Sequence, residues 1–331
     1  MDLDRAARAR ADHRSPEAGG TPLKVHAALA LVQIFFAANA VYGKIALGAV
    51  SPLALLAVRG PSGALVFLGL RVFASRRHGW QRVARADLAS LLALSVLGVS
   101  ANQLLFYTGL SRTTAVNTVV LNASIPVFAA GFSIVLGRER ATVGRLAGLG
   151  VALAGALLVV LYGRADRGPL RLVLGGGELF LVANSAMYAL YLVLGRTIFQ
   201  RYRTDTAIAW IFGLAALALL PWCLGPFARE VPMAAPRVHW AMIYIVLGPT
   251  VGAYFLNGFA LRHARPSIVA IYIYAQPVLA ALMARALLGE HLPAATVTGA
   301  ALIAAGIALV SFSRGPTERR PDDEGSSPGD R

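Results

Sequence analysis

Ten apolar runs, each long enough to cross a lipid bilayer as a helix, dominate the sequence. A hydrocarbon core about 30 Å thick requires roughly 20 apolar residues in an α-helix, and short polar or Gly/Pro-containing segments separate the runs. The alternation of polar and apolar residues that is typical of membrane β-barrel strands is absent from them. The sequence therefore predicts an all-α polytopic membrane protein with ten transmembrane helices, at residues 25–48, 52–74, 88–110, 113–137, 143–162, 172–195, 206–227, 238–261, 267–288 and 293–312.

The composition agrees with a membrane location and excludes most catalytic chemistry. Hydrophobic residues make up 57% of the chain and charged residues 14%, whereas soluble domains carry about 25% charged residues. Nine of the 16 acidic residues lie before residue 24 or after residue 313, so few carboxylates remain to hold a metal. The single cysteine, Cys223, excludes an internal disulfide and any CxxC site. GxSxG, HExxH and GxxxxGK(S/T) sequences are absent, so we predict no enzyme activity, no metal, no cofactor and no ATP hydrolysis.

The basic residues are distributed unevenly between alternate loops. The formal net charge is +15. With the N-terminus inside, the inner segments carry 22 Lys and Arg residues and the outer segments carry six. Because cytoplasmic loops retain basic residues, we predict a multi-pass protein of the cell inner membrane with both termini in the cytoplasm. The excess of basic residues thus indicates the orientation of the protein, and it also favours contact with the anionic headgroups of the lipid bilayer. We predict no binding of nucleic acid.

The sequence repeats itself with an offset of 151 residues. Pro126 aligns with Pro277 and Glu139 with Glu290, and two glycines follow in each copy at the same spacing. The repeated unit contains five apolar runs, an odd number, so the second copy enters the membrane in the opposite sense to the first. Secondary transporters use inverted repeats of this kind, and they expose a site between the two halves to each side of the membrane in turn. We therefore predict two inverted five-helix repeats.

This duplication divides the chain into five segments. Both ends are charged and rich in Pro, Gly and Ser, a composition typical of disorder. The predicted organisation is a disordered cytoplasmic tail at 1–24, a first repeat at 25–162, a linker at 163–171, a second repeat at 172–312 and a disordered cytoplasmic tail at 313–331.

Three stretches of the sequence resemble a known family. They are SPLALLAVR, which ends at Arg59, IPVFAAGFSIVLGRER at the end of the fourth run, and its counterpart AQPVLAALMARALLGEH in the ninth. With the two five-helix halves, they resemble the EamA branch of the drug/metabolite transporter superfamily, including its aromatic amino-acid exporters, over residues 25–312. The resemblance implies an inner-membrane carrier. Its central cavity would be lined mainly by runs one, three, four, six, eight and nine, with runs five and ten at the periphery.

Polar and aromatic side chains recur inside the apolar runs, where polar groups are rare and energetically costly. Asn184, Tyr188 and Tyr191 lie at positions i, i+4 and i+7 and share one helical face. Such residues either line a cavity or join neighbouring helices by hydrogen bonds, and tyrosine also gathers at membrane interfaces. The candidate substrate-binding residues are Phe36, Asn39, Gln103, Tyr107, Asn122, Asn184, Tyr188, Tyr191, Tyr254, Asn257, Tyr272 and Gln276.

Four further residues are candidates for a role in charge or movement. Arg59 lies about 10 Å into its run, and it either snorkels to the surface, pairs with a helix-end carbonyl or binds a substrate carboxylate. Glu178 is the only carboxylate expected to face the path of a solute through the membrane. It either couples transport to protons or is solvated or salt-bridged at the membrane interface. Pro126 and Pro277 each remove a backbone hydrogen bond, and they are either hinges or static kinks that shape the cavity.

The expected lining carries no fixed negative charge near its centre. It suits a small zwitterionic, neutral or aromatic solute that is held by ring stacking and amide hydrogen bonds. We predict a secondary transporter that exports small organic metabolites by alternating access, namely amino acids, including aromatic ones, or related drugs. The alternative is a carrier for the uptake or exchange of a sugar- or nucleoside-like solute.

Overall fold

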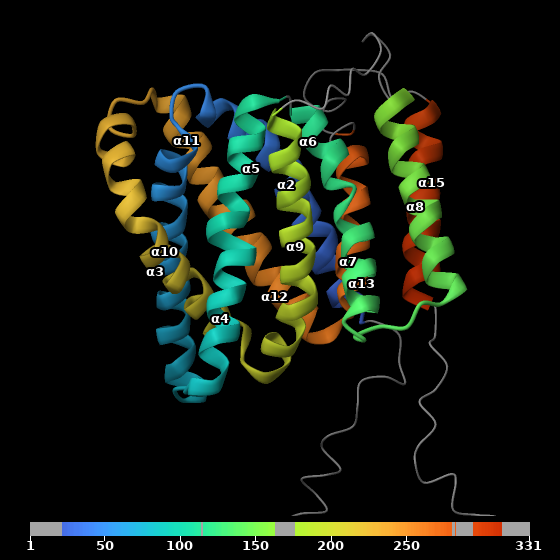
Figure 1. The fold of residues 1–331 in the computed structure, drawn as a ribbon, viewed down its shortest axis with the longest axis horizontal. Helices are drawn as coiled ribbons and strands as arrows, with labels where there is room; N and C mark the ends of the chain where they lie inside the picture. Colours follow the sequence, from blue (N-terminus) through green and yellow to red (C-terminus); the bar gives the residue numbers. More distant parts are fainter. Residues whose placement is uncertain (1–21, 114, 163–175, 280–281, 283–293, 313–331) are drawn as a thin grey trace, which may run out of the picture.

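The computed structural model describes residues 22–113, 115–162, 176–279, 282 and 294–312. Every regular element in these ranges is a helix, and the helices stand side by side in one bundle (Figure 1). The elements in chain order are α2 (Leu23–Leu47), α3 (Pro52–His78), η1 (Arg85–Asp87), α4 (Leu88–Ser95), η2 (Val96–Ser100), α5 (Ala101–Arg112), α6 (Ala115–Asn122), α7 (Ile125–Val135), α8 (Val143–Tyr162), α9 (Gly176–Arg201), α10 (Thr204–Glu230), α11 (Pro236–Ile245), η3 (Val246–Gly252), α12 (Ala253–His263), α13 (Pro266–Ile271), η4 (Tyr272–Ala275) and α15 (Ala294–Phe312).

These helices coincide with the predicted apolar runs, which confirms the all-helical membrane fold. Within the described ranges, seven helical segments are long and apolar enough to cross a membrane. Shorter apolar helices occupy the fifth, ninth and tenth runs, at Val143–Leu158, Pro266–Leu279 and Val297–Phe312. The count of ten transmembrane helices and the inversion of the repeats stay predictions.

Several predicted segments fall wholly or largely outside the described residues. They are the linker at 163–171, the tail at 313–331, nearly all of the tail at 1–24, and Glu290.

The third and eighth runs each contain a turn of π-helix at a corresponding place. η2 interrupts the third run and η3 the eighth. The Ser100 hydroxyl donates to the Ser95 carbonyl at 3.2 Å, and the Thr250 hydroxyl donates to the Ile245 carbonyl at 2.6 Å. Each hydroxyl thus bonds to the carbonyl five residues before it, and the two positions differ by 150 residues. π-Helical turns are rare and are frequently found at functional sites.

Helices α8 and α15 pack against each other at one edge of the bundle (Figure 1). Their backbones approach closely at glycines. A β-carbon added to Gly155 would lie 2.7 Å from the carbonyl oxygen of Gly299, and one added to Gly148 would lie 2.9 Å from that of Gly306. Because these glycines are aligned by the internal repeat, the same small face serves both copies. The edge position agrees with the peripheral fifth and tenth helices that the family resemblance implies.

The two aligned prolines both follow an interruption of an α-helix. α6 ends at Asn122, and Pro126 lies in the first turn of α7, where its missing N–H leaves no hydrogen bond unmade. Pro277 follows the 3₁₀ turn η4, which ends at Ala275. The interruption of the fourth run therefore lies between Asn122 and Ile125, just before Pro126. A hinge role for either proline stays a prediction.

Polar contacts join the helices at both ends of the bundle. At one end, the carboxylate of Glu230 accepts hydrogen bonds from the backbone N–H of Ser51 at 2.5 Å and from its hydroxyl at 3.0 Å. At the opposite end, Arg201 donates to the carboxylate of Asp87 at 2.6 Å and 2.8 Å. These contacts hold α10 to the start of α3, and α9 to the start of the third run.

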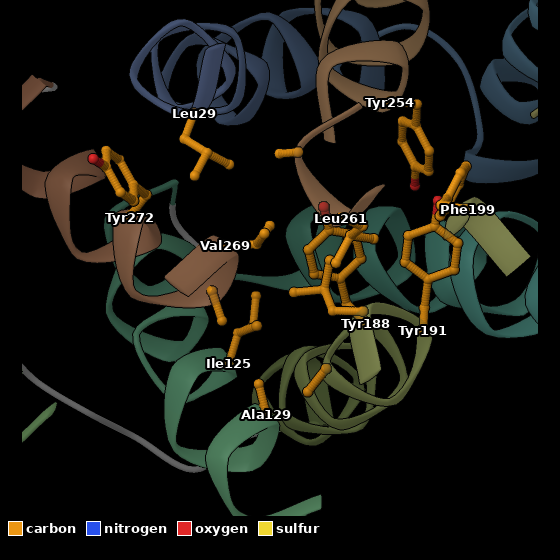
Figure 2. Packing of buried hydrophobic residues seen from close by; sticks show 14 of the residues in the cluster. Leu29, Ile125, Ala129, Tyr188, Tyr191, Phe199, Tyr254, Leu261, Val269 and Tyr272 are labelled. Carbon is orange, nitrogen blue, oxygen red and sulfur yellow. The ribbon is translucent and has the colours of Figure 1, made fainter. Parts of the chain in front are cut away.

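The buried core lies where α2, α7, α9, α12 and α13 meet. Leu29, Ile125, Tyr188 and Leu261 converge there from different helices (Figure 2). Large apolar side chains also cover the outside of the bundle, among them Trp222. An apolar outer surface around a partly polar interior is expected of a protein whose surroundings are lipid.

Candidate functional site

A central cavity that is partly open to the outside lies between helices of the first and second halves of the chain. It combines amide groups, aromatic rings and one guanidinium group. The helices that contribute come from both halves of the chain. They are α2, α3, α5, α6 and α7 from the first half, and α9 and α12 with the η4 region from the second. The lining residues are Phe36, Asn39, Arg59, Asn102, Gln103, Phe106, Asn122, Ile125, Asn184, Tyr188, Tyr254, Ile273 and Gln276.

Arg59 projects into the interior rather than to the surface. Its side chain is on α3 and the residue is 3% exposed. Its Nη1 donates to the hydroxyl of Tyr107 at 2.5 Å, and that hydroxyl donates in turn to the amide oxygen of Asn39 at 3.1 Å. The guanidinium carbon lies 5.5 Å from the ring centre of Tyr107 and 6.0 Å from that of Tyr254. The structure thus excludes snorkelling of Arg59, one of the three alternatives that the sequence leaves open.

The amide side chains of the lining also connect helices. Asn102 on α5 and Asn184 on α9 each donate from the side-chain amide to the other's backbone carbonyl, at 3.1 Å and 2.9 Å. Gln103 donates to the hydroxyl of Tyr254 at 3.1 Å, and Gln276 donates to the side chain of Gln33 at 2.9 Å. The same residues therefore join helices and border the cavity. Both roles expected for polar residues in the apolar runs, cavity lining and helix joining, apply together.

Aromatic rings form one wall of the cavity. The ring of Tyr188 stacks on that of Tyr191, with centres 5.7 Å apart and planes at 24°, and Phe36 meets Tyr188 edge-on at 6.2 Å. Asn257 fixes the position of Tyr188 by donating to its hydroxyl at 2.8 Å. Figure 2 shows Tyr188 and Tyr191 on α9 with Tyr254 facing them from α12. A flat, fixed wall of this kind suits an apolar or aromatic group of a solute.

Four predicted substrate-binding residues do not border the cavity. Tyr107 lies behind Arg59, and Tyr191 and Asn257 lie behind Tyr188. Tyr272 points toward the start of α2, where its hydroxyl is 2.5 Å from Nδ1 of His26. The first three support residues that do border the cavity, whereas Tyr272 belongs to a separate contact between α2 and η4.

Glu178 also lies away from the cavity. It is in the first turn of α9 and is 4% exposed. One of its carboxylate oxygens accepts a hydrogen bond from the hydroxyl of Thr113 at 2.5 Å. No acidic residue is among the described residues that border the cavity, and within the described parts of the chain no group of three or more His, Cys, Asp and Glu residues gathers as a metal site would require.

The sequence prediction missed four lining residues. Asn102 directly precedes Gln103 and carried the same signal, a polar side chain inside an apolar run. Phe106 is one helical turn after Gln103, so its face could have been inferred from the period of the helix. Ile125 and Ile273 are apolar residues in apolar segments, and no feature of the sequence distinguishes them from residues that face lipid or core.

Comparison with known proteins places this architecture in a family. The model of the EamA-like transporter family matches the chain twice, at residues 23–161 and 175–312. An uncharacterized transporter of Archaeoglobus fulgidus is 29% identical over 293 residues, which cover 87% of this chain and 97% of that protein. A probable terminal-alkyne amino-acid exporter of Streptantibioticus cattleyicolor is 28% identical over 257 residues, covering 76% of this chain and 82% of that protein.

The fold itself is also found among solved structures. One crystal structure aligns with a TM-score of 0.63 at 21% sequence identity, over 84% of this chain and 95% of the other. At this identity the likeness shows the fold alone. The two family matches carry the further conclusion that the chain belongs to the EamA-like transporter family of the drug/metabolite transporter superfamily, and that it is a multi-pass membrane transporter and not an enzyme.

Proposed function

We propose that the protein is a secondary carrier that exports small organic solutes, namely amino acids, including aromatic ones, or related drugs, across the inner membrane. The observation that carries this proposal is the central cavity, which combines stacked aromatic rings with amide groups from both repeats. Such a lining can bind a small solute through its apolar surface and its hydrogen-bonding groups together. The similarity to an amino-acid exporter supports the same class of cargo.

Alternating access would arise from ten transmembrane helices in two inverted five-helix halves. Two separate matches to one family model support the duplication. The π-helical turns η2 and η3 support it further, because their bonded hydroxyls lie 150 residues apart, within one residue of the 151-residue offset of the repeat, and the two turns carry the same hydroxyl-to-carbonyl bond. In an inverted repeat, exchanging the conformations of the halves turns a cavity open to one side into a cavity open to the other. Pro126 and Pro277, each beside a helix interruption, are the proposed hinges.

In the proposed orientation, both termini lie in the cytoplasm. The start of α2 and the end of α15 lie at the same end of the bundle (Figure 1), and the excess of Lys and Arg in the inner segments supports the cytoplasmic side for that end. A cysteine in place of His78, introduced with Cys223→Ser, should react with an impermeant thiol reagent only in inverted vesicles. Labelling in intact cells would overturn this orientation.

Release from proteoliposomes tests the function. Liposomes that contain the purified protein and labelled phenylalanine should lose the label faster than protein-free liposomes, and Tyr188→Ala should slow the loss about tenfold or more, because the wall of the cavity is removed. Unaltered release in Tyr188→Ala would contradict a role for this cavity. Transport of a sugar or nucleoside in place of amino acids would favour the alternative, an uptake or exchange carrier.

A further inference from the structure

We propose that Arg59 and Asn122 form the two poles of a site for a zwitterion, with Arg59 binding the carboxylate of an α-amino acid and Asn122 accepting a hydrogen bond from its ammonium group. The inference rests on the proposed function and names the feature of the solute that the carrier recognises. Arg59 and Asn122 border the same cavity and come from different elements, α3 and α6.

Arg59 has no anionic partner in the described part of the protein. Its polar contact is the neutral hydroxyl of Tyr107, and its Nε is buried with no acceptor within hydrogen-bond distance. The faces of Tyr107 and Tyr254 attract the cation but supply no formal negative charge. Removing a guanidinium from water without an anion is costly. Because the planar guanidinium group matches a carboxylate in shape and hydrogen bonding, a carboxylate on the solute would complete the site.

A second buried arginine on the same helix shows the contrast. Arg71 is 8% exposed and lies outside the cavity. It donates to the backbone carbonyl of Gln81 at 3.2 Å, and its guanidinium carbon lies 4.2 Å from the ring centre of Trp80. Asp205 forms its ion pair with Arg203 at 3.1 Å. The Nε of Arg71 is buried without an acceptor, as that of Arg59 is. The two arginines therefore differ in their position, because Arg59 alone of the two borders the cavity.

Asn122 supplies the opposite pole. Its side-chain oxygen is buried and accepts no hydrogen bond, which leaves a strong acceptor facing the interior unsatisfied. Asn122 ends α6, and the first residue of α7, Ile125, borders the same cavity. An ammonium group, which only donates hydrogen bonds, satisfies the unpaired oxygen of Asn122. A carboxylate placed there would face another hydrogen-bond acceptor.

A series of phenylalanine analogues tests the site in the wild-type protein. Uptake of labelled phenylalanine into proteoliposomes is measured against unlabelled phenylalanine, phenylalanine amide, which lacks the carboxylate, and 3-phenylpropionate, which lacks the ammonium group. We expect phenylalanine to compete at least about 10-fold more effectively than either analogue, because each analogue leaves one buried group unpaired. Equal competition by all three would overturn the inference, although the protein would still be a carrier.

Two variants assign the poles. Arg59→Gln should abolish the preference for phenylalanine over its amide and keep the preference over 3-phenylpropionate, whereas Asn122→Leu should show the reverse. Arg71→Gln is the matched control, since it removes a buried arginine from the same helix outside the cavity, and it should keep both preferences. An unchanged selectivity pattern in Arg59→Gln would overturn the assignment.

Two further results distinguish a failure of the proposed transport function from a failure of the zwitterion site. If the wild-type protein moves none of the labelled solutes, the proposed function itself fails, and the inference falls with it. If a variant elutes as aggregate in size-exclusion chromatography, the wild-type analogue series still decides whether the carboxylate and the ammonium group are recognised.

Discussion

Asn102 and Asn184 exchange hydrogen bonds with each other's backbone. The side-chain amide of Asn102 donates to the carbonyl of Asn184 at 3.1 Å, and the amide of Asn184 donates to the carbonyl of Asn102 at 2.9 Å. The pair joins α5 in the first half of the chain to α9 in the second half, directly at the wall of the cavity. One of the contacts that join the two halves of the chain is therefore also part of the surface that a solute would meet.

This reciprocal pair should stabilise the bundle measurably. Replacing either Asn102 or Asn184 by Ala removes one hydrogen bond, and we expect a loss of about 1 kcal/mol in the free energy of unfolding. The double variant should cost less than the sum of the two single variants, because the residues act as a unit. SDS-induced unfolding in mixed micelles measures these differences, with the exposed Ser111→Ala as control. Strictly additive losses would contradict the coupling.

The π-helical turn η2 depends on the absence of a side chain at Gly98. A β-carbon there would collide with the ring of Tyr191. Gly98→Ala should therefore lower the free energy of unfolding by about 1–3 kcal/mol, and adding Tyr191→Leu should restore part of the loss. Gly213→Ala is the control, since no atom lies within 4 Å of its added β-carbon, and it should not destabilise the helix. Equal effects of the two glycine replacements would count against the close contact.

Glu139 should stabilise the contact between α7 and α13. Its carboxylate accepts from the Ser267 hydroxyl at 2.6 Å and from the Ser267 N–H at 3.2 Å, and it lies 3.5 Å from Nη1 of Arg145. Glu139→Gln keeps the shape and removes the charge, so we expect a loss of about 1.5–3 kcal/mol, the range for hydrogen bonds to charged groups. The unfolding midpoint measures it, and an unchanged midpoint would show that the carboxylate contributes little.

Proton coupling through Glu178 has a separate test. The described residues that border the cavity include no carboxylate, and Glu178 accepts a hydrogen bond from Thr113 outside it. We therefore expect facilitated transport, with phenylalanine flux equal in wild type and Glu178→Gln under an imposed pH gradient. Accumulation driven by the gradient in wild type and lost in Glu178→Gln would instead establish the coupling.

The sequence predicted the features that depend on composition and spacing. Apolar length located the helices, and the repeated spacing aligned Gly148 with Gly299, two glycines that the structure places on the face where α8 meets α15. Most of the cavity lining was predicted because a polar group in an apolar run must find partners, as Gln103 and Asn184 do. These are local properties of the chain, which is why the sequence alone reveals them.

The remaining features depend on contacts between distant segments. The π-helical turns were not predicted, because the contact of Gly98 with Tyr191 is visible only in the fold. Tyr272 was assigned to the lining, yet its hydroxyl meets His26. Tyr272 begins the 3₁₀ turn η4, where the rotation per residue differs from that of an α-helix, and a polar ring in an apolar run does not reveal which way such a turn directs it.

Solute counterflow tests the central claim most directly. Proteoliposomes are loaded with unlabelled phenylalanine and diluted into labelled phenylalanine, and the label inside is followed with time. A carrier with alternating access should accumulate the label transiently above its external concentration, and Tyr188→Ala should abolish the overshoot while Arg71→Gln preserves it. Entry of label no faster than into protein-free liposomes, for phenylalanine and for other small organic solutes alike, would contradict the account.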